Sequence, residues 1–283
     1  MNDDTERAQQ IAAWRAVAPG WVRRRAFIWE ATHGVSERLV ELLDPQPGET
    51  ILDLAGGLGE TGFLASGRIG PDGRLITTDA APEMVDAARE RAAELGVGNA
   101  EFHVMDAIAI PLDDASVDGV LFRFGLMLIP DMEQATAEVA RVLRPGGRLA
   151  LAVWAPPDAN DWMTAAGRSA LALGLIERPE PDAPGPFRLA DPERQRALLG
   201  DAGLQLETLE EVPVTWRAAS LDESWEATRD TSRTVALLLE RLGADEIEAV
   251  RQATAERLAG YVAVDGSVAV PGVARVALAR RLP

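Results

Sequence analysis

Apolar residues recur at helical spacing in the first part of the chain. From Trp21 to Leu43 they lie three or four positions apart, which predicts an amphipathic helix. A helical stretch also begins near residue 5. The intervening Pro19 and Gly20 predict a break between the two helices.

From residue 50 the pattern alternates between short apolar runs and longer periodic stretches. The short runs predict strands, and the periodic stretches predict helices. The predicted strands are 50–54, 74–79, 100–105, 117–122 and 149–153; the predicted helices begin near residue 61 and cover 82–95 and 131–143. Repeated strand–helix units of this kind predict an α/β fold, with a parallel sheet and helices on both of its faces.

The alternation of short apolar runs and periodic stretches becomes less regular after Trp154. Asp191 followed by Pro192 predicts a helix start with an aspartate N-cap, and Pro271 with Gly272 predicts a turn. The other predicted elements are helices at 162–175, 191–202, 221–242 and 245–258, a proline-rich loop at 179–186, and strands at 205–216 and 273–282.

The turn after the first predicted strand is rich in glycine. Asp53 lies at the end of that strand, and the glycines that follow are Gly56, Gly57, Gly59 and Gly62. Glycines allow a sharp backbone turn and let a ligand approach the main chain closely. The segment therefore predicts a site for a nucleotide-like cofactor, with an ordinary strand-to-helix turn as the alternative.

The glycine spacing admits a dinucleotide cofactor. Gly57, Gly59 and Gly62 match the G-x-G-x-x-G pattern, and Asp79 follows Gly59 at about the distance at which an acid binds the ribose hydroxyls of NAD. An NAD(P)-dependent oxidoreductase is therefore one candidate.

Two carboxylates favour a different cofactor. Asp53, inside the strand end, suits a ligand that carries a free amino group. Asp106, after the third predicted strand, can accept a hydrogen bond from an adenine amino group, and Ala107 can donate its N–H to a ring nitrogen.

Together these segments resemble the class I S-adenosylmethionine-dependent methyltransferases, the large group that includes the ubiquinone/menaquinone-biosynthesis methyltransferases. Residues 52–59 resemble the first motif of that family, with Ala55 where a glycine is usual. Residues 143–147 resemble its Leu-(Lys/Arg)-Pro-Gly-Gly turn. The resemblance covers about residues 35–154 and extends weakly to the end of the chain.

The resemblance implies a seven-stranded, Rossmann-like, mostly parallel sheet whose last strand is antiparallel, with a helical cap from the N-terminal segment and the insertions. The whole chain, 1–283, would then form a single methyltransferase domain. Its expected parts are an N-terminal helical cap at 1–48, a cofactor-binding core at 49–154, helical insertions at 155–190 and 218–262, and the rest of the core at 191–217 and 263–283.

The resemblance also implies a set of residues for S-adenosylmethionine. Asp53 would hold the amino group, the loop backbone would approach the carboxylate and ribose, and Asp79 would accept from the ribose hydroxyls. Asp106 would read adenine. The remaining expected contacts are Ala55, Gly56, Gly57 and Gly59 of the loop, Ala80 beside Asp79, Met84 against adenine, Ala107, and Arg123 at the methionine end or on an anionic substrate.

Methyl transfer to a small-molecule acceptor, with S-adenosylhomocysteine as the product, is the expected reaction. Tryptophans in the predicted cap suit an apolar or aromatic acceptor, although packing of the cap explains them equally well. Enzymes that methylate amines of nucleic acids or proteins often carry (Asp/Asn)-Pro-Pro-(Tyr/Phe) after the fourth strand. This chain has Arg123 and Phe124 followed by Gly and Leu there, which argues against that class. No catalytic residue is assigned, His33 is only a weak candidate for a base, and a non-catalytic S-adenosylmethionine-binding protein is a further alternative.

The amino-acid composition excludes several kinds of chemistry and of partner. The 283 residues include no cysteine, no lysine and two histidines, which excludes disulfides and lysine Schiff bases and leaves no metal site expected. A net charge of −17 argues against nucleic acid or an anionic membrane surface as partner. No membrane span or signal segment is expected, so the predicted location is the cytoplasm, with the oligomeric state, monomer or homodimer, left open.

Overall fold

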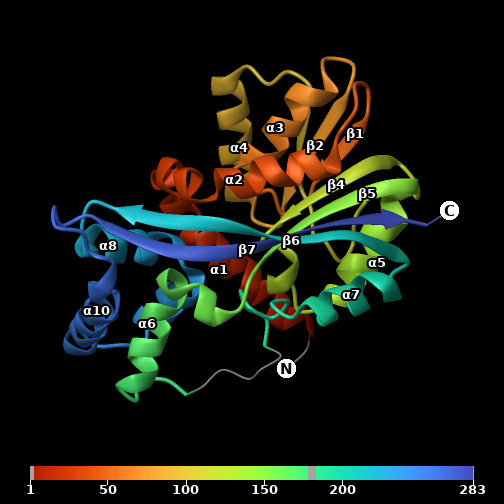
Figure 1. Ribbon diagram of the computed structural model, residues 1–283. Helices are drawn as coiled ribbons and strands as arrows, with labels where there is room; N and C mark the ends of the chain where they lie inside the picture. Colours follow the sequence, from red (N-terminus) through yellow and green to blue (C-terminus); the bar gives the residue numbers. More distant parts are fainter. Residues whose placement is uncertain (1–2, 178–182, 283) are drawn as a thin grey trace. The chain divides into compact units, whose positions relative to one another are not determined.

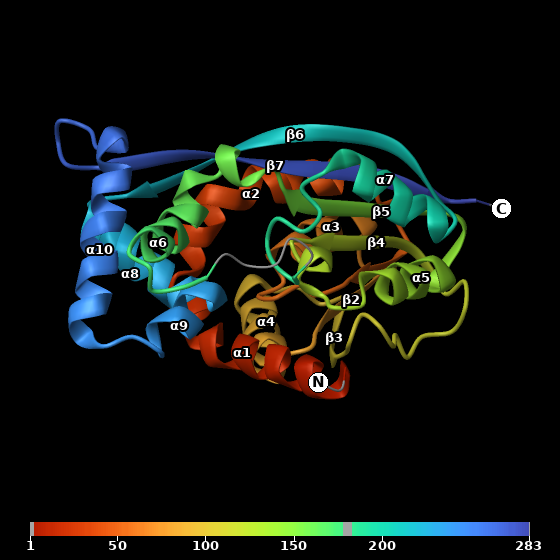
Figure 2. The same ribbon diagram turned by 90° about the horizontal axis from the view of Figure 1, so that it is seen from below.

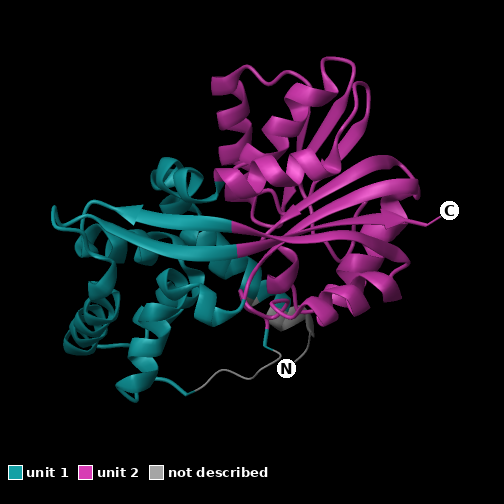
Figure 3. Cartoon of the chain, in the orientation of Figure 1, with its two compact units in different colours: residues 1–32, 156–183, 213–273 teal, residues 33–155, 184–212, 274–283 magenta. Residues whose placement is uncertain are grey.

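The computed structural model describes residues 3–177 and 183–282. They form two compact units (Figure 3). One unit takes its described residues from 1–32, 156–183 and 213–273, and the other from 33–155, 184–212 and 274–283. The second unit contains the glycine loop and every cofactor residue that the sequence predicts.

The strands form a seven-stranded sheet with the order β3-β2-β1-β4-β5-β7-β6 in the described part of the chain (Figure 1). The strands are β1 Thr50–Asp53, β2 Arg74–Asp79, β3 Ala100–Val104, β4 Val117–Arg123, β5 Leu143–Trp154, β6 Leu204–Ala218 and β7 Val268–Arg281. Strands β1 to β5 pair in parallel, whereas β7 runs antiparallel to β5. The predicted Rossmann-like sheet with an antiparallel last strand is confirmed.

Helices pack against this sheet because its central strands are apolar on both faces. The helices with residues in this unit are α2 Arg25–Leu43, α3 Glu60–Ile69, α4 Pro82–Leu95, α5 Met132–Val142 and α7 Pro192–Asp201. Helix α3 packs on β1 and β2, α4 on β2 and β3, and α5 on β5 and α7 (Figure 2). The predicted N-cap of α7 is confirmed, since the Asp191 carboxylate accepts from the Glu193 N–H at 3.0 Å.

The order in which the strands are added to the sheet changes direction at β1. From β1 the chain moves outward through β2 and β3, and it then returns to the other side of β1 as β4 and β5. In open sheets of this type, ligands bind outside the carboxyl ends of the strands at such a switch point. A ligand site is therefore expected at the loops that follow β1 and β4.

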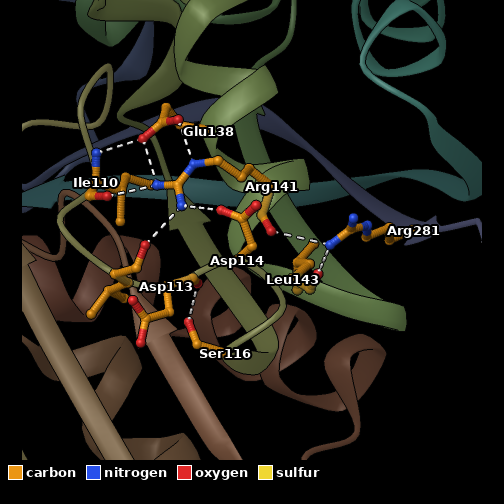
Figure 4. A network of polar contacts seen from close by, with 9 residues as sticks. Ile110, Asp113, Asp114, Ser116, Glu138, Arg141, Leu143 and Arg281 are labelled. Carbon is orange, nitrogen blue, oxygen red and sulfur yellow. Dashed lines mark hydrogen bonds and ion pairs between the residues drawn. The ribbon is translucent and has the colours of Figure 1, made fainter.

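A polar network anchors the loop between β3 and β4 (Figure 4). The Arg141 guanidinium of α5 donates to the carbonyl oxygens of Ile110 and Leu112, at 2.7 and 2.8 Å, and pairs with Glu138 and Asp114. The Glu138 carboxylate accepts from the Ile110 N–H at 2.7 Å. Charge-assisted bonds to main-chain atoms are among the stronger ones, so α5 fixes the loop that begins at Asp106.

The other unit consists of helices, the C-terminal part of β6 and the N-terminal part of β7. Its helices are α1 Asp3–Arg23, α6 Asp161–Ala172, α8 Leu221–Thr231, α9 Arg233–Leu239 and α10 Ala244–Leu258, and short 3₁₀ turns occur in the chain at Leu126–Leu128, Pro157–Ala159 and Ala259–Tyr261. Trp162 stacks on Trp216 with ring centroids 4.5 Å apart, and Phe27 meets Trp216 edge-on at 4.6 Å. Among the described residues, no helix is long and apolar enough to cross a membrane.

The predicted break at Pro19 and Gly20 lies inside α1, which continues to Arg23. Gly20 has a packing role instead, because a Cβ there would lie 1.9 Å from the Asp230 carbonyl oxygen of α8. The short break in the helix falls at Arg24.

The predicted helix 221–242 is interrupted at Ser232. This residue has extended backbone angles, and its hydroxyl accepts from the Val235 N–H as the N-cap of α9. A serine side chain competes with helical hydrogen bonds, which explains the interruption within an otherwise helical pattern.

Pro271 and Gly272 lie within β7 and form no turn. The buried side chain of Asn160 substitutes for a neighbouring strand, because its Oδ1 accepts from the Val273 N–H and its Nδ2 donates to the Val273 carbonyl, both at 3.0 Å. A Cβ at Gly272 would overlap the Trp162 indole nitrogen at 2.4 Å. The predicted turn at 144–147 is a bulge in β5, where the pairing with β4 shifts between Val117 and Gly119. The predicted loop 179–186 lies partly outside the described residues.

Candidate functional site

Asp53 is a buried carboxylate at the end of β1. Its side chain is 0% exposed, and neither oxygen has a partner with hydrogen-bond geometry among the described residues. Burial raises the pKa of Asp53 to about 7, while the charge of Arg123 and the Gly62 N–H act in the opposite direction. A buried carboxylate without a partner is costly, which indicates that a ligand completes its interactions.

Two glycines make room for this carboxylate. An ideal Cβ at Gly56 would lie 2.4 Å from Asp53 Oδ2, and one at Gly62 would lie 2.6 Å from the same atom. Gly57 has a φ of +58° and open space where a side chain would be. The loop thus leaves main-chain atoms uncovered beside the Asp53 carboxylate.

We expect Gly56→Ala to lower the free energy of unfolding by about 2 kcal/mol, because the added methyl overlaps a carboxylate that cannot move within the core. Denaturation in urea measures this loss. Gly67→Ala is the matched control on exposed α3 surface, where a Cβ meets nothing within 4 Å. It should stabilise the protein by about 0.5–1 kcal/mol. Equal effects of the two substitutions would contradict the steric account.

Asp79 ends β2 and is joined to the glycine loop. Its Oδ2 accepts from the Gly57 N–H at 3.1 Å, and its Oδ1 accepts from the Ala81 N–H at 2.9 Å. Burial raises the pKa of Asp79 to about 6, against the effect of the N–H groups of Ala81, Gly57 and Ala80. The side chain keeps some exposure. Because each carboxylate oxygen can accept more than one hydrogen bond, both remain able to bind a ligand's hydroxyls.

Asp106 and Ala107 follow β3 at the same edge of the sheet. The Met105 N–H donates to the Asp79 carbonyl at 3.0 Å, which keeps the two strand ends together. Asp106 Oδ1 accepts from the Ile108 N–H at 3.1 Å and is partly exposed, whereas Ala107 is buried. Met84, on α4 just after β2, is 2% exposed and belongs to the core.

Arg123 ends β4, next to β1. Its charge acts on Asp53 and on Glu60, the first residue of α3, and burial lowers the pKa of the guanidinium. The guanidinium carbon lies 5.5 Å from the centroid of the Phe124 ring. A partly buried cation therefore stands beside a buried carboxylate at the switch point. This pairing of opposite charges suits a ligand that carries both an amino group and a carboxylate.

The structure also brings Phe124, which the sequence placed with Arg123 after the fourth strand, against Trp154, which the sequence did not place in the site. Phe124, after β4, stacks on Trp154, at the end of β5, with centroids 3.9 Å apart and planes 6° from parallel. The signal that could have found this pair is the parallel register of β4 and β5, which puts both strand ends at one edge. His33, the weak candidate for a base, lies exposed on α2.

Backbone strain marks the two loops at the switch point. Ala55, after β1, has a φ of +51°, and Phe124, after β4, has a φ of +58°. Residues with side chains rarely adopt this region, and such residues concentrate at functional sites. A Cβ on Gly125 would lie 2.9 Å from the Ala55 Cβ, so the two strained loops lie directly against each other.

Comparison with known proteins points to one enzyme class. A family model described as a methyltransferase domain matches residues 51–147. The arsenite methyltransferase of Halobacterium salinarum is 42% identical over 105 residues, which are 37% of this chain and 27% of that protein. The ubiquinone/menaquinone biosynthesis C-methyltransferase of Pseudomonas savastanoi pv. phaseolicola is 32% identical over 157 residues, 54% of this chain and 61% of that protein. The chain thus spans less than two thirds of the length of these relatives.

A solved structure shares the fold over most of the chain. The YcgJ protein of Bacillus subtilis superposes with a TM-score of 0.59 and 21% identity, covering 89% of this chain and 99% of that one. The matched family segment contains β1 from its second residue, β2 to β4, the glycine loop, Asp79 and Asp106.

Proposed function

We propose that this protein, in which residues 51–147 match a methyltransferase domain and which is similar to class I S-adenosylmethionine-dependent methyltransferases, transfers the methyl group of S-adenosylmethionine to a small-molecule acceptor. The observation that carries the proposal is the set of carboxylates on three adjacent strand ends. Asp53 ends β1, Asp79 ends β2 and Asp106 follows β3, all around one glycine loop. This spacing suits a ligand with an amino group at one end and an adenosine at the other.

The amino acid part of the cofactor would lie at the switch point. Asp53 has a buried carboxylate that lacks a partner among the described residues, and a cationic amino group would supply one. The loop backbone from Ala55 to Gly59 would approach the carboxylate of the ligand, and Arg123 would contact the same end through its positive charge. Binding would therefore give a hydrogen-bonded partner to a buried carboxylate that has none among the described residues.

The nucleoside would lie along β2 and β3. Asp79 would accept hydrogen bonds from the ribose hydroxyls while keeping those from the loop, and Ala80 would lie beside the ribose. Asp106 would accept from the adenine amino group, and Ala107 would donate its N–H to a ring nitrogen. Met84 is enclosed by the core, so its expected contact with adenine would be limited to the atoms at the edge of the pocket.

When bound, S-adenosylmethionine would supply an activated methyl group to an electron pair of an oxygen, nitrogen, carbon or sulfur acceptor, and the electrons of the broken carbon–sulfur bond would stay on sulfur. The protein's contribution is to hold sulfur, methyl carbon and acceptor in line. An acceptor that must lose a proton needs a base, and we assign that role to none of the described side chains.

The buried Asp53 carboxylate favours this function over the oxidoreductase, and the glycine spacing alone does not distinguish them. In the G-x-G-x-x-G pattern, Gly59 is required because a Cβ would lie 2.5 Å from the Phe63 ring, and Gly62 because a Cβ would meet Asp53. Two of the three fingerprint glycines thus have packing reasons inside the chain. Asp53 at the strand end also puts a buried negative charge where a pyrophosphate would have to approach.

Calorimetric titration tests the cofactor. We expect S-adenosylmethionine and S-adenosylhomocysteine to bind and NAD and NADP to show no heat of binding under the same conditions. Tighter binding of either dinucleotide would contradict the proposal. Formation of S-adenosylhomocysteine with a panel of small acceptors separates an enzyme from a non-catalytic binding protein, because the latter produces none with any acceptor.

A further inference from the structure

We infer that the cavity between α6, α8 and α10 is a binding site for a small, uncharged and mainly apolar molecule that carries one hydrogen-bond-accepting oxygen. All of the residues that line this cavity belong to the helical unit, whereas the residues proposed for the cofactor belong to the other unit. The inference therefore does not depend on methyl transfer.

The cavity lies where α10 packs against both α6 and α8 (Figure 2). Its apolar wall consists of Trp162 and Ala166 of α6, Leu221 and Trp225 of α8, and Ala255 and Leu258 of α10. The space that the centre of a water molecule can enter is about 20 Å³, so the cavity admits a molecule of only a few non-hydrogen atoms. An apolar wall of this kind favours an occupant that is itself mainly apolar.

Ser224 provides one polar group that a ligand could satisfy. It lines the cavity and is 3% exposed, and its hydroxyl makes no hydrogen bond with any described residue. The hydroxyls of Thr228 and Thr254, which also line the cavity, donate to the carbonyl oxygens of Ser224 and Val250 at 2.9 and 2.7 Å. A buried hydroxyl without a partner is costly, so Ser224 is suited to donate to an oxygen of the ligand.

The charged residues of the cavity wall are already paired, which favours an uncharged ligand. Arg251 Nη1 donates to Asp222 at 2.7 Å, and its Nε and Nη2 donate to Glu248 at 2.8 and 2.7 Å. The Asp222 side chain is 80% exposed, so this pair lies on the solvent side of the cavity. An anion would have to displace a carboxylate from Arg251, and a cation would leave water for an apolar wall.

Four small molecules of nearly equal size test the selectivity of the cavity. The neutral ones are 2-propanol and acetone, and the charged ones are isopropylammonium and acetate. Titrations are followed by the indole N–H signals of Trp162 and Trp225 in NMR spectra of the full-length protein. We expect both neutral molecules to bind with dissociation constants in the millimolar range, and both ions to bind at least about tenfold more weakly.

Ser224→Ala should weaken the binding of 2-propanol and acetone by about fivefold, because the donor to their oxygen is lost. Ser169→Ala is the matched control, since Ser169 is a buried serine of α6 that does not line the cavity, and it should keep the wild-type affinity.

Ala255→Leu should abolish saturable binding by filling the cavity. Ala244→Leu, on an exposed position in the first turn of α10, is its control and should bind both neutral molecules as the wild type does. A crystal soaked in 2-propanol should show its oxygen on Ser224. The inference would be overturned by equal binding of the ions, by unchanged affinity in Ser224→Ala and Ala255→Leu, or by the absence of saturable binding of either neutral molecule.

Discussion

Asp53→Asn is expected to stabilise the ligand-free protein and to weaken its binding of S-adenosylhomocysteine. The pKa of Asp53 is raised to about 7 by burial, so its ionised form opposes folding. A group of this kind contributes nothing unfavourable below its unfolded pKa, and its cost develops as pH rises from about 4 to about 7. We therefore expect Asp53→Asn to raise the free energy of unfolding by about 2 kcal/mol near pH 8 and to change it little near pH 4.

The same substitution removes the proposed partner of the cofactor's amino group. Loss of one member of a buried charge pair should weaken S-adenosylhomocysteine binding by about 100-fold, measured by calorimetry. Methylthioadenosine is the matched control ligand, since it has the nucleoside and the sulfur but lacks the amino acid part. Its affinity should be the same in both proteins. Equal losses for the two ligands, or a less stable Asp53→Asn protein near pH 8, would show that Asp53 has a different role.

Asp79→Asn should weaken S-adenosylhomocysteine and methylthioadenosine alike, by about 100-fold, because both carry the ribose that the carboxylate is proposed to bind. The amide keeps the shape of the side chain but loses the charge and one acceptor oxygen. One main-chain bond, from Gly57 or Ala81, is then weakened as well. Thermal unfolding of the ligand-free variant measures that structural part separately.

The two ligands distinguish the two aspartates, because Asp53→Asn should weaken only S-adenosylhomocysteine whereas Asp79→Asn should weaken both. Removing the amino acid part of the ligand should abolish the effect of Asp53→Asn on affinity and leave the effect of Asp79→Asn unchanged. An Asp79→Asn protein that binds methylthioadenosine as tightly as the wild type would rule out the ribose assignment. The lowered charge should also make the affinity of the variant less dependent on pH near 6, where Asp79 titrates.

Local sequence patterns were sufficient to predict the central strands of the fold. The places where the structure differs from the prediction depend on contacts between residues far apart in the sequence. Short apolar runs between glycine and proline turns sufficed for β1 to β5, and the family resemblance supplied the antiparallel direction of the last strand. Gly20, by contrast, packs against Asp230, and the strand conformation at Pro271 depends on Asn160. These partners lie more than a hundred residues away in the sequence, so no window of the chain contains the information.

The candidate site also has parts that local sequence predicted and parts that depend on distant contacts. The resemblance read from residues 52–59 and 143–147 is confirmed by the family model that matches 51–147. Local sequence placed Asp53, Asp79 and Asp106 at strand ends. It could not show that Asp53 is buried with no hydrogen-bond partner among the described residues, that Gly62 accommodates it, or that Phe124 stacks on Trp154. Each of these depends on the packing of neighbouring elements. Individual cofactor contacts stay predictions.

A crystal structure of the S-adenosylhomocysteine complex tests the central claim most directly. We expect the amino group of the ligand within hydrogen-bond distance of Asp53, the ribose hydroxyls on Asp79 and the adenine amino group on Asp106. A ligand whose amino group lies away from Asp53, with that carboxylate still lacking a partner, would contradict it.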